Sequence, residues 1–428
     1  MIILIKNSRL IDPKNNINEI LDIVIKDGIV EKIGKNLKEK GNEDEVIDAS
    51  GHILTPGLID VHAHLREPGF EYKETIKTGT MAAARGGFTS VVCMANTDPV
   101  NDNKSVTEYI TNKAKLEGYC RVLPCGSITK GLRGEELSEI GEMFEAGIVA
   151  ISDDGKSVRN AELLRKALEY TKTFCIPVIS HCEDPDLSKG YVHEGSVSLV
   201  TGLDAVPSIA EEIIVARDIA IAEYVGSPIH LTHISTAGSV NIIADAKTRY
   251  KMITADTCPH YFILTDEATI DFNTNTKVNP PLRSKKDLDA IKEGLKKGII
   301  DIIATDHAPH DLTSKDVEFN IASLGISGFE TALPLSLTLV HEGILSIEGL
   351  IEKYTVNPAR LLNLPYGEIG VGRVADLIIF NPDIEWIVDK NTFYSKGKNT
   401  PFHGWKMKGK NLLTIVQGKI VYRDTSLI

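Results

Sequence analysis

Residues 60–66 combine two histidines and an arginine in the sequence DVHAHLR, directly after the apolar residues 57–59. The apolar run predicts a buried strand that ends at this motif. Residues two apart in a strand point to the same face, so His62 and His64 converge as two imidazole ligands of one metal ion must. Arg66 follows in the same register and can place a guanidinium beside that metal. Because a histidine pair at this spacing also occurs in ordinary surface loops, the prediction depends on further ligands elsewhere.

Suitable residues follow other predicted strands. Apolar runs predict eight strands in the central part of the chain, at residues 54–64, 89–95, 121–128, 148–152, 177–181, 228–233, 251–255 and 299–305. The ends of these strands carry amide, carboxylate and imidazole groups, namely those of Asn96, Asp153, Asp154, His181, His233, His260, Asp306, His307 and His310. Taken alone, such a histidine is more often a simple hydrogen-bonding residue, and such an aspartate a helix cap or turn residue.

The order of the predicted elements indicates an α/β fold. Helical patterns occur at residues 74–85, 104–117, 135–145, 160–173, 208–224, 239–249, 285–297 and 328–341. Eight strand-helix units in sequence are typical of a (β/α)8 TIM-like barrel, and an open doubly wound sheet is the alternative. We favour the barrel because the polar residues gather at the strand ends, as they do at the carboxyl-terminal face of a barrel.

In a barrel, four histidines and two aspartates at the same ends of the strands would converge on one site. Histidine and carboxylate ligands without a dedicated thiolate suit Zn²⁺, Mn²⁺ or Co²⁺, and zinc is the default. Five to six ligands exceed the need of one tetrahedral ion. The sequence therefore predicts two ions that are bridged by a carboxylate or a hydroxide.

The two ends of the chain have a different pattern. Residues 1 to about 52 and about 366 to 428 alternate short apolar runs with Gly and Asp turns, which predicts small antiparallel sheets. Chain termini are often close, so we expect both ends to form one small β-sandwich domain. The predicted organisation is residues 1–53 and 366–428 as the two parts of this domain, with the barrel at residues 54–365.

Composition limits the kinds of binding partner and the cellular compartment that we expect for this protein. The chain has 428 residues with 47 basic and 59 acidic side chains, a net charge of −12. No Lys/Arg run with interleaved aromatic residues indicates a nucleic-acid partner, and an anionic substrate would need local cations. Six cysteines lack CxxC spacing, and neither a signal sequence nor a membrane span is recognisable. These features predict a cytoplasmic protein with free thiols.

Several motifs together resemble the class I dihydroorotases of the amidohydrolase superfamily. They are the sequences DVHAHLREPG at 60–69, MANT at 94–97, SDDG at 152–155, HCE at 181–183, THIS at 232–235, TDHAPH at 305–310, NPAR at 357–360 and ADL at 375–377. The resemblance covers nearly the whole chain. It implies the barrel and β-domain architecture and a metal-dependent hydrolysis of a cyclic amide.

The resemblance also implies roles for individual residues. His62 and His64 would bind one zinc ion, His181 and His233 the other, and Asp154, hydroxide or both would bridge them. Asp306 would be a further ligand and the general acid/base. Relatives such as hydantoinases and allantoinases use a carboxylated lysine as the bridge, and this chain has no lysine before Gly155 at that strand end.

Substrate contacts are implied in the same way. Arg66, Asn96 and His310 would hold the substrate carboxylate, Asn279 would make a further contact, and the backbone of Leu324 and Gly325 would complete the site. The implied reaction is the reversible zinc-dependent interconversion of (S)-dihydroorotate and N-carbamoyl-L-aspartate in de novo pyrimidine (UMP) biosynthesis.

Two other functions remain open at this point. Another cyclic amidase, an allantoinase or hydantoinase, would share the fold and the metals. An inactive scaffold for aspartate transcarbamoylase is the alternative outside catalysis, although this chain keeps every metal ligand. The resemblance also implies a homodimer and an association of the active enzyme with aspartate transcarbamoylase.

Overall fold

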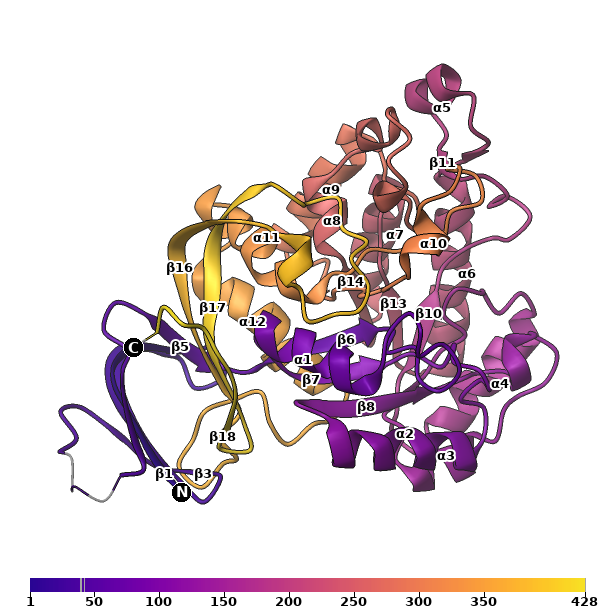
Figure 1. Cartoon of the computed structure of the whole chain (residues 1–428). Coiled ribbons are helices and arrows are strands. Elements are labelled where there is room, and N and C mark those ends of the chain that lie inside the picture. Colours follow the sequence, from indigo (N-terminus) through magenta and orange to yellow (C-terminus); the bar gives the residue numbers. More distant parts are fainter. Residues whose placement is uncertain (39–40, 42, 428) are drawn as a thin grey trace.

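The computed structural model describes residues 1–38, 41 and 43–427, and within them two large sheets organise the chain (Figure 1). One sheet is the barrel of the central segment, and the other joins the two ends of the chain. The predicted architecture is therefore confirmed.

The barrel consists of eight parallel strands in the order of the sequence, which are β6 (Leu58–Ala63), β7 (Phe88–Cys93), β8 (Arg121–Gly126), β9 (Ala150–Ile151), β10 (Val178–His181), β13 (Ile229–Thr232), β14 (Ile253–Thr257) and β15 (Ile302–Ile303). It closes at the end of β6 and beyond β15, where Ala63 and His307 form a parallel bridge and His64 N donates to His307 O at 2.8 Å. Closure brings the first and last strand ends together, which an open sheet would keep apart.

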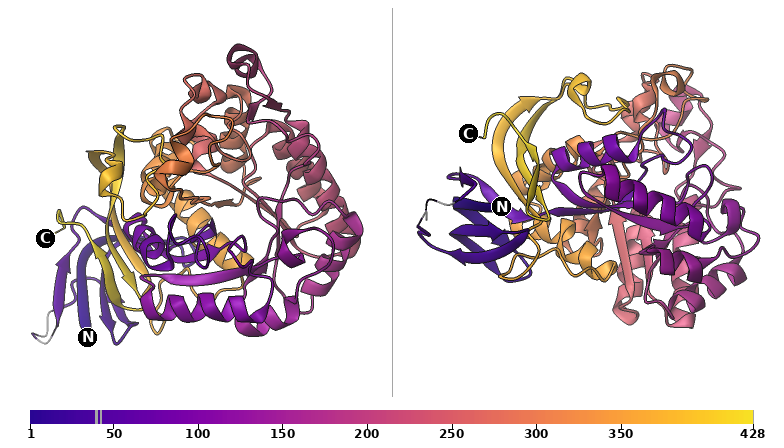
Figure 2. Two further views of the ribbon diagram at one scale, coloured as in Figure 1. Left: turned by 45° about the vertical axis from the view of Figure 1, so that its right-hand side comes forward. Right: turned by 60° about the horizontal axis from the view of Figure 1, so that its bottom comes forward.

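Helices surround the barrel, as both views in Figure 2 show. They are α1 (Ile76–Gly86), α2 (Lys104–Glu117), α3 (Ile140–Ala146), α4 (Ala161–Thr171), α5 (Ser196–Thr201), α6 (Ile209–Val225), α7 (Ala237–Arg249), α8 (Pro259–Ile263), α9 (Lys285–Lys296), α10 (Leu312–Lys315), α11 (Phe329–His341), α12 (Ile347–Tyr354) and α13 (Val356–Leu361). Short 3-10 turns are η1 (Lys130–Leu132), η2 (Asp266–Thr269), η3 (Thr274–Thr276) and η4 (Lys390–Thr392). A two-stranded sheet of β11 (Val192–His193) and β12 (Ala205–Val206) lies beside α5.

Local sequence sets the ends of these helices. Asn103, Asn160 and Ser284 each accept backbone N–H bonds at the start of a helix, which satisfies donors that have no partner within the helix. Gly87 and Gly226 end α1 and α6 in the left-handed conformation that glycine adopts without steric cost.

The end sheet has the order β18-β17-β16-β5-β1-β2-β3, with β4 paired to β1, and is mixed because β4 and β5 run parallel to β1. Its strands are β1 (Ile2–Asp12), β2 (Ile17–Lys26), β3 (Ile29–Gly34), β4 (Glu45–Asp48), β5 (Ile53–Pro56), β16 (Leu377–Ile387), β17 (Lys406–Val416) and β18 (Lys419–Arg423). Ile5 and Ile23 from the N-terminal strands share one apolar core with Ile379 and Leu413 from the C-terminal strands.

One predicted strand was wrong in its extent. The run 54–64 is two strands, because β5 pairs with β1 and β16 in the end sheet and only β6 belongs to the barrel. Gly57 separates them, and a Cβ at this position would lie 2.1 Å from the Thr89 side chain. Both halves are buried and apolar, so hydrophobicity alone does not reveal the change of sheet.

A test of the barrel core is Phe88→Ala. Phe88 is fully buried, and its ring lies 5.6 Å from that of Phe329 and 5.8 Å from that of Tyr354. We expect a loss of about 3–5 kcal/mol in the free energy of unfolding, because the substitution leaves a cavity. Urea denaturation measures this loss. The control Phe272→Ala, at a side chain that is 48% exposed, should cost about 1 kcal/mol or less; equal losses would contradict the assigned core.

Candidate active site

The six predicted metal ligands meet at the carboxyl ends of the barrel strands. His62 is in β6 and His64 follows it, His181 ends β10, and the other three residues, Asp154, His233 and Asp306, follow β9, β13 and β15. All six side chains are buried. Residues up to 244 positions apart in sequence thus share one site because the barrel is closed.

Asp154 is at the centre of this cluster. Its Oδ1 lies 3.3 Å from His62 Nε2, 3.4 Å from His181 Nδ1 and 3.5 Å from His233 Nε2. Its Oδ2 lies 3.5 Å from His64 Nε2. One carboxylate therefore faces both histidine pairs, which is the arrangement that a bridging ligand requires.

Asp306 approaches the same cluster from the last barrel strand. Its Oδ1 lies 3.1 Å from His64 Nε2 and 3.5 Å from His62 Nε2. Burial alone would raise the pKa of Asp306, but the hydrogen bond from His64 and the charge of His62 lower that pKa to about 2. Asp306 is therefore an ionised carboxylate that can accept a proton.

Three histidines are oriented through the ring nitrogen that points away from the cluster. His62 Nδ1 lies 2.7 Å from Thr232 Oγ1, His64 Nδ1 lies 2.9 Å from Asn96 Oδ1, and His181 Nε2 lies 3.1 Å from Glu183 Oε2. Such contacts are typical of metal-binding histidines, because they fix the ring and leave the other nitrogen free for the metal.

A second layer of polar residues was not predicted from the sequence. Asp256 is fully buried and accepts hydrogen bonds from Thr232 Oγ1 at 2.9 Å and from His233 N at 2.7 Å, and it lies 2.8 Å from His230 Nε2. It thereby holds one ligand segment directly and His62 through Thr232. No clear signal for this role was present in the sequence, because Asp256 lies in a short strand, ITADT, that also contains two threonines.

The donor set fits divalent metal ions. The buried atoms His62 Nε2 and Asp154 Oδ1 have no hydrogen-bond partner within the described residues, and both point into the cluster. Two groups of ligand atoms lie close enough to hold an ion, His62 with Asp154 and His233, and His62 with His64 and Asp306. Burial opposes charge on His62, yet Asp154 and Asp306 raise its pKa to about 10. The two carboxylates thus make the site favourable for cations.

A third such group consists of Cys258, His260 and Asp306. Cys258 is completely buried, and burial raises the pKa of its thiol well above the ordinary value. Cys182 is also buried and lies against Ser180. The described residues contain six free cysteines, of which Cys175 alone is exposed.

Three residues of the site have left-handed backbone conformations, with φ of 62° at Arg66, 42° at His233 and 44° at Asp306. A non-glycine residue in this region costs free energy and persists only where surrounding contacts impose it. His233 directly follows β13, and Arg66 and Asp306 lie three residues beyond β6 and β15, so all three strained positions are in the segments that leave the strand ends at the site.

The site opens into a cavity of about 170 Å³. All the predicted substrate contacts line it, together with five of the six predicted ligands; the lining residues are His64, Arg66, Asn96, Asp154, Gly155, His181, His233, Asn279, Asp306, Ala308, His310, Leu324 and Gly325. His62 is absent from the lining, so a small molecule in the cavity would contact the other ligands directly.

A cationic group, Arg66, lines the same cavity as the histidine and aspartate cluster. Arg66 Nε donates to Pro309 O at 3.3 Å, and its Nη2 lies 3.3 Å from His310 Nε2. His310 Nε2 donates to Leu324 O at 2.8 Å, so Arg66 is a neighbour of this nitrogen and not its donor. Burial and the charge of Arg66 lower the pKa of His310 to about 2, which keeps the imidazole neutral.

Two family models match most of the chain. Residues 51–239 match the family model described as Dihydro-orotase-like, and residues 283–422 match the Amidohydrolase family. The chain is 56% identical over 427 residues to the dihydroorotase of Acetivibrio thermocellus, and this alignment covers 99% of this chain and 100% of that protein. It is 54% identical over 424 residues to the dihydroorotase of Geotalea daltonii, with the same coverage of both chains.

The chain belongs to the dihydroorotase family. Among solved structures, an L-hydantoinase (dihydropyrimidinase) from Arthrobacter aurescens has the same fold, with a TM-score of 0.88 at 24% identity over 100% of this chain and 97% of that one. A D-hydantoinase aligns with a TM-score of 0.86 at 25% identity, over 100% of this chain and 96% of that one. The family is metal-dependent, in agreement with the histidine and aspartate cluster.

The two adjacent aspartates at the end of β9 give a matched test of this cluster. Asp154 faces four histidines, whereas Asp153 points away from them and accepts backbone N–H bonds from Ile128 at 2.8 Å and Thr129 at 3.0 Å. We expect Asp154→Asn to reduce the metal bound per chain and Asp153→Asn to retain it, as measured by elemental analysis after gel filtration. Full metal content in Asp154→Asn would exclude the bridging role.

Proposed function

We propose that this protein is a dihydroorotase, which interconverts (S)-dihydroorotate and N-carbamoyl-L-aspartate in pyrimidine (UMP) biosynthesis. The observation that carries the proposal is the cavity itself, which a histidine and aspartate cluster lines together with the partly buried guanidinium of Arg66. A hydrolytic centre opposite an arginine suits a cyclic amide that carries a carboxylate. Full-length similarity to proteins named dihydroorotase supports the same substrate.

The proposed cofactor is a pair of zinc ions. His62 and His64 would hold one ion with Asp306, and His181 and His233 would hold the other. The central position of Asp154 supports its role as the bridge. When bound, the ions would supply Lewis-acid chemistry by polarising a carbonyl and lowering the pKa of water at the site.

The residues of the chain would perform the remaining steps. Arg66 would bind the substrate carboxylate through two N–H groups, with Asn96 and His310 beside it. Asp306 would accept a proton from the attacking water and deliver it to the ring nitrogen when the amide bond breaks. In the biosynthetic direction the same carboxylate would remove the proton from that nitrogen as the ring closes and water leaves.

Local charge explains how an acidic protein would bind this anion. The chain has a net charge of −12, so its overall field repels a carboxylate. Arg66 is partly buried, and the removal of water around it lowers its pKa to about 10, so it remains charged at neutral pH. A charge held away from water acts more strongly than one at the surface.

The matched variants Arg66→Ala and Arg66→Lys test the carboxylate contact. We expect Arg66→Ala to raise KM for dihydroorotate about 10- to 100-fold, because a charged hydrogen bond contributes roughly 1.5–3 kcal/mol. Arg66→Lys keeps the charge but lacks the planar fork, so its KM should lie between those of wild type and Arg66→Ala. An unchanged KM in both variants would exclude the contact.

Asp306→Asn tests the proton transfer. We expect kcat to fall about 10²- to 10⁴-fold, since general acid-base catalysis accounts for rate factors of this size. Metal content should be determined on the same sample, because Asp306 is also a proposed ligand. Normal turnover in this variant would refute the role.

The substrate itself is tested by assaying the zinc-loaded protein with dihydroorotate, allantoin and a hydantoin in parallel, with a metal count. We expect turnover of dihydroorotate alone. Turnover of allantoin or hydantoin instead would assign the chain to another cyclic amidase. No turnover with full metal would indicate dependence on a partner, and no turnover without metal would indicate a scaffold.

The family resemblance also supports proposals on assembly and location. We propose a homodimer in the cytoplasm that associates with aspartate transcarbamoylase. Among the described residues, no helix is long and apolar enough to cross a membrane. Light scattering of the protein alone and mixed with aspartate transcarbamoylase measures both assemblies.

A further inference from the structure

Residues 393–400, which we call the strap, leave the end sheet between η4 and β17 and lie against the barrel (Figure 1). Phe393 and Phe402 anchor this region in an apolar cluster that includes Cys258 and Tyr261 of the barrel. The strap therefore belongs to the C-terminal part of the chain but packs beside the candidate active site.

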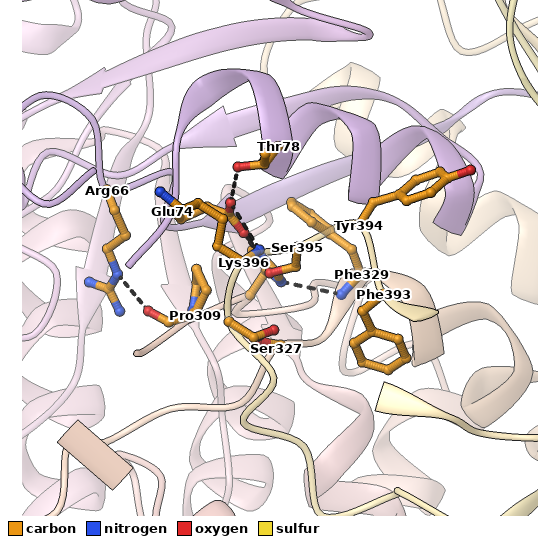
Figure 3. A network of polar contacts seen from close by, with 12 residues as sticks. Arg66, Glu74, Thr78, Pro309, Ser327, Phe329, Phe393, Tyr394, Ser395 and Lys396 are labelled. Carbon is orange, nitrogen blue, oxygen red and sulfur yellow. Dashed lines mark hydrogen bonds and ion pairs between the residues drawn. The ribbon is translucent and has the colours of Figure 1, made fainter. Parts of the chain in front are cut away.

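A second anchor is the buried carboxylate of Glu74, just before α1. Ser395 Oγ and Lys396 N both donate hydrogen bonds to this carboxylate. Glu74 Oε2 also lies 3.5 Å from Nε2 of His307, the neighbour of Asp306 in the chain. Figure 3 shows Ser395 and Lys396 beside Glu74, with Arg66 and Pro309 in the same view.

Asn399 is the residue of the strap that reaches the site. Its Nδ2 donates to Ala308 O at 3.0 Å and to Gly325 O at 2.9 Å. Its Oδ1 accepts from His310 N and from Ser327 Oγ, both at 2.9 Å. The side chain is 4% exposed, and its amide uses both donors and accepts twice.

These contacts join two loops that bear proposed substrate contacts. One loop carries His310 and the other carries Leu324 and Gly325. The two loops also meet directly, since His310 Nε2 donates to Leu324 O. Asn399 thus fixes the backbone on both sides of this imidazole-carbonyl contact.

The backbones on both sides of Asn399 are closely packed against the neighbouring loops. A Cβ at Gly397 would lie 2.5 Å from Pro309 Cβ, and a Cβ at Gly325 would lie 2.5 Å from Ala308 Cβ. Pro309 O in turn accepts a hydrogen bond from Arg66. A shift of the strap would therefore move the backbone that positions the guanidinium as well as His310.

We propose that Asn399 is a positioning residue that sets the specificity of this site for cyclic amides bearing a carboxylate. It does so by holding His310, the Leu324–Gly325 backbone and, through Pro309, Arg66 in one geometry. The inference rests on the proposed function, because it assigns the carboxylate to this side of the cavity. It predicts an effect on substrate binding that is separate from the metal centre.

Asn411 provides a matched control for a purely structural role. It is also a buried amide in the C-terminal part, 5% exposed, and its Nδ2 contacts Arg85 O at 3.1 Å and Thr414 Oγ1 at 2.8 Å. These partners are in α1 and β17, and none lines the cavity. Asn411→Ala should therefore lower stability without changing substrate binding.

The experiment compares Asn399→Ala, Asn399→Asp and Asn411→Ala with wild type, all zinc-loaded. Asn399→Asp keeps the shape but turns a carboxylate oxygen toward two carbonyl oxygens. We expect both Asn399 variants to raise KM for dihydroorotate about 10- to 100-fold, with kcat changed less than about threefold, because displaced binding groups weaken substrate orientation. Metal content should be unchanged. Hydrogen exchange should accelerate at residues 306–310 and 323–327 in these variants and not in Asn411→Ala.

The two readouts separate this inference from the proposed function. Unchanged exchange at both loops, or a KM equal to that of wild type, would overturn the role of Asn399. If wild type does not turn over dihydroorotate, the proposed function fails. In that case the proposed role of Asn399 in specificity also fails. The hydrogen-exchange measurement alone then decides whether Asn399 holds the two loops.

Discussion

The buried carboxylate of Asp154 is the interaction on which the rest of the site depends. It faces four imidazoles at 3.3–3.5 Å. Burial alone would raise the pKa of Asp154, yet His62, His181 and His233 hold that pKa well below its usual range. A buried charge of this kind is stable only where opposite charges or cations surround it. The carboxylate therefore depends on the closed barrel, which brings the imidazoles to it, and it gives the site its affinity for cations.

Closure of the barrel fixes the positions of the imidazoles and carboxylates relative to one another. His64 and His307 are joined by a backbone hydrogen bond, so the first and last strand ends share one local structure. Outside the six candidate ligands, Thr232, Asp256 and Glu183 restrict the imidazoles further. Because folding already orients these side chains, no free energy has to be spent on orienting them during each catalytic cycle.

The chain ends contribute to the site as well as to the separate β domain. The strap comes from the C-terminal part, yet Asn399 joins loops that belong to the barrel. The small domain is therefore coupled to the side of the cavity where we propose that the substrate carboxylate binds, whereas the histidine and aspartate cluster is positioned by the barrel strands. In the proposed mechanism this division separates the binding of an anion from the activation of an amide.

The sequence by itself determined the eight strands, most helices and the residue types at the strand ends. These features follow from hydrophobic periodicity and from the polar residues that end each apolar run, and both are local properties of the sequence. It also identified the six candidate ligands through the motifs around His62, Asp154 and Asp306. Only the tertiary structure decided that the run 54–64 divides between two sheets, since both halves are buried and apolar. Asp256 and Asn399 likewise gave no local signal of their role. Their contacts are with residues distant in sequence, and only the closed barrel and the packing of the strap bring those partners within hydrogen-bonding distance.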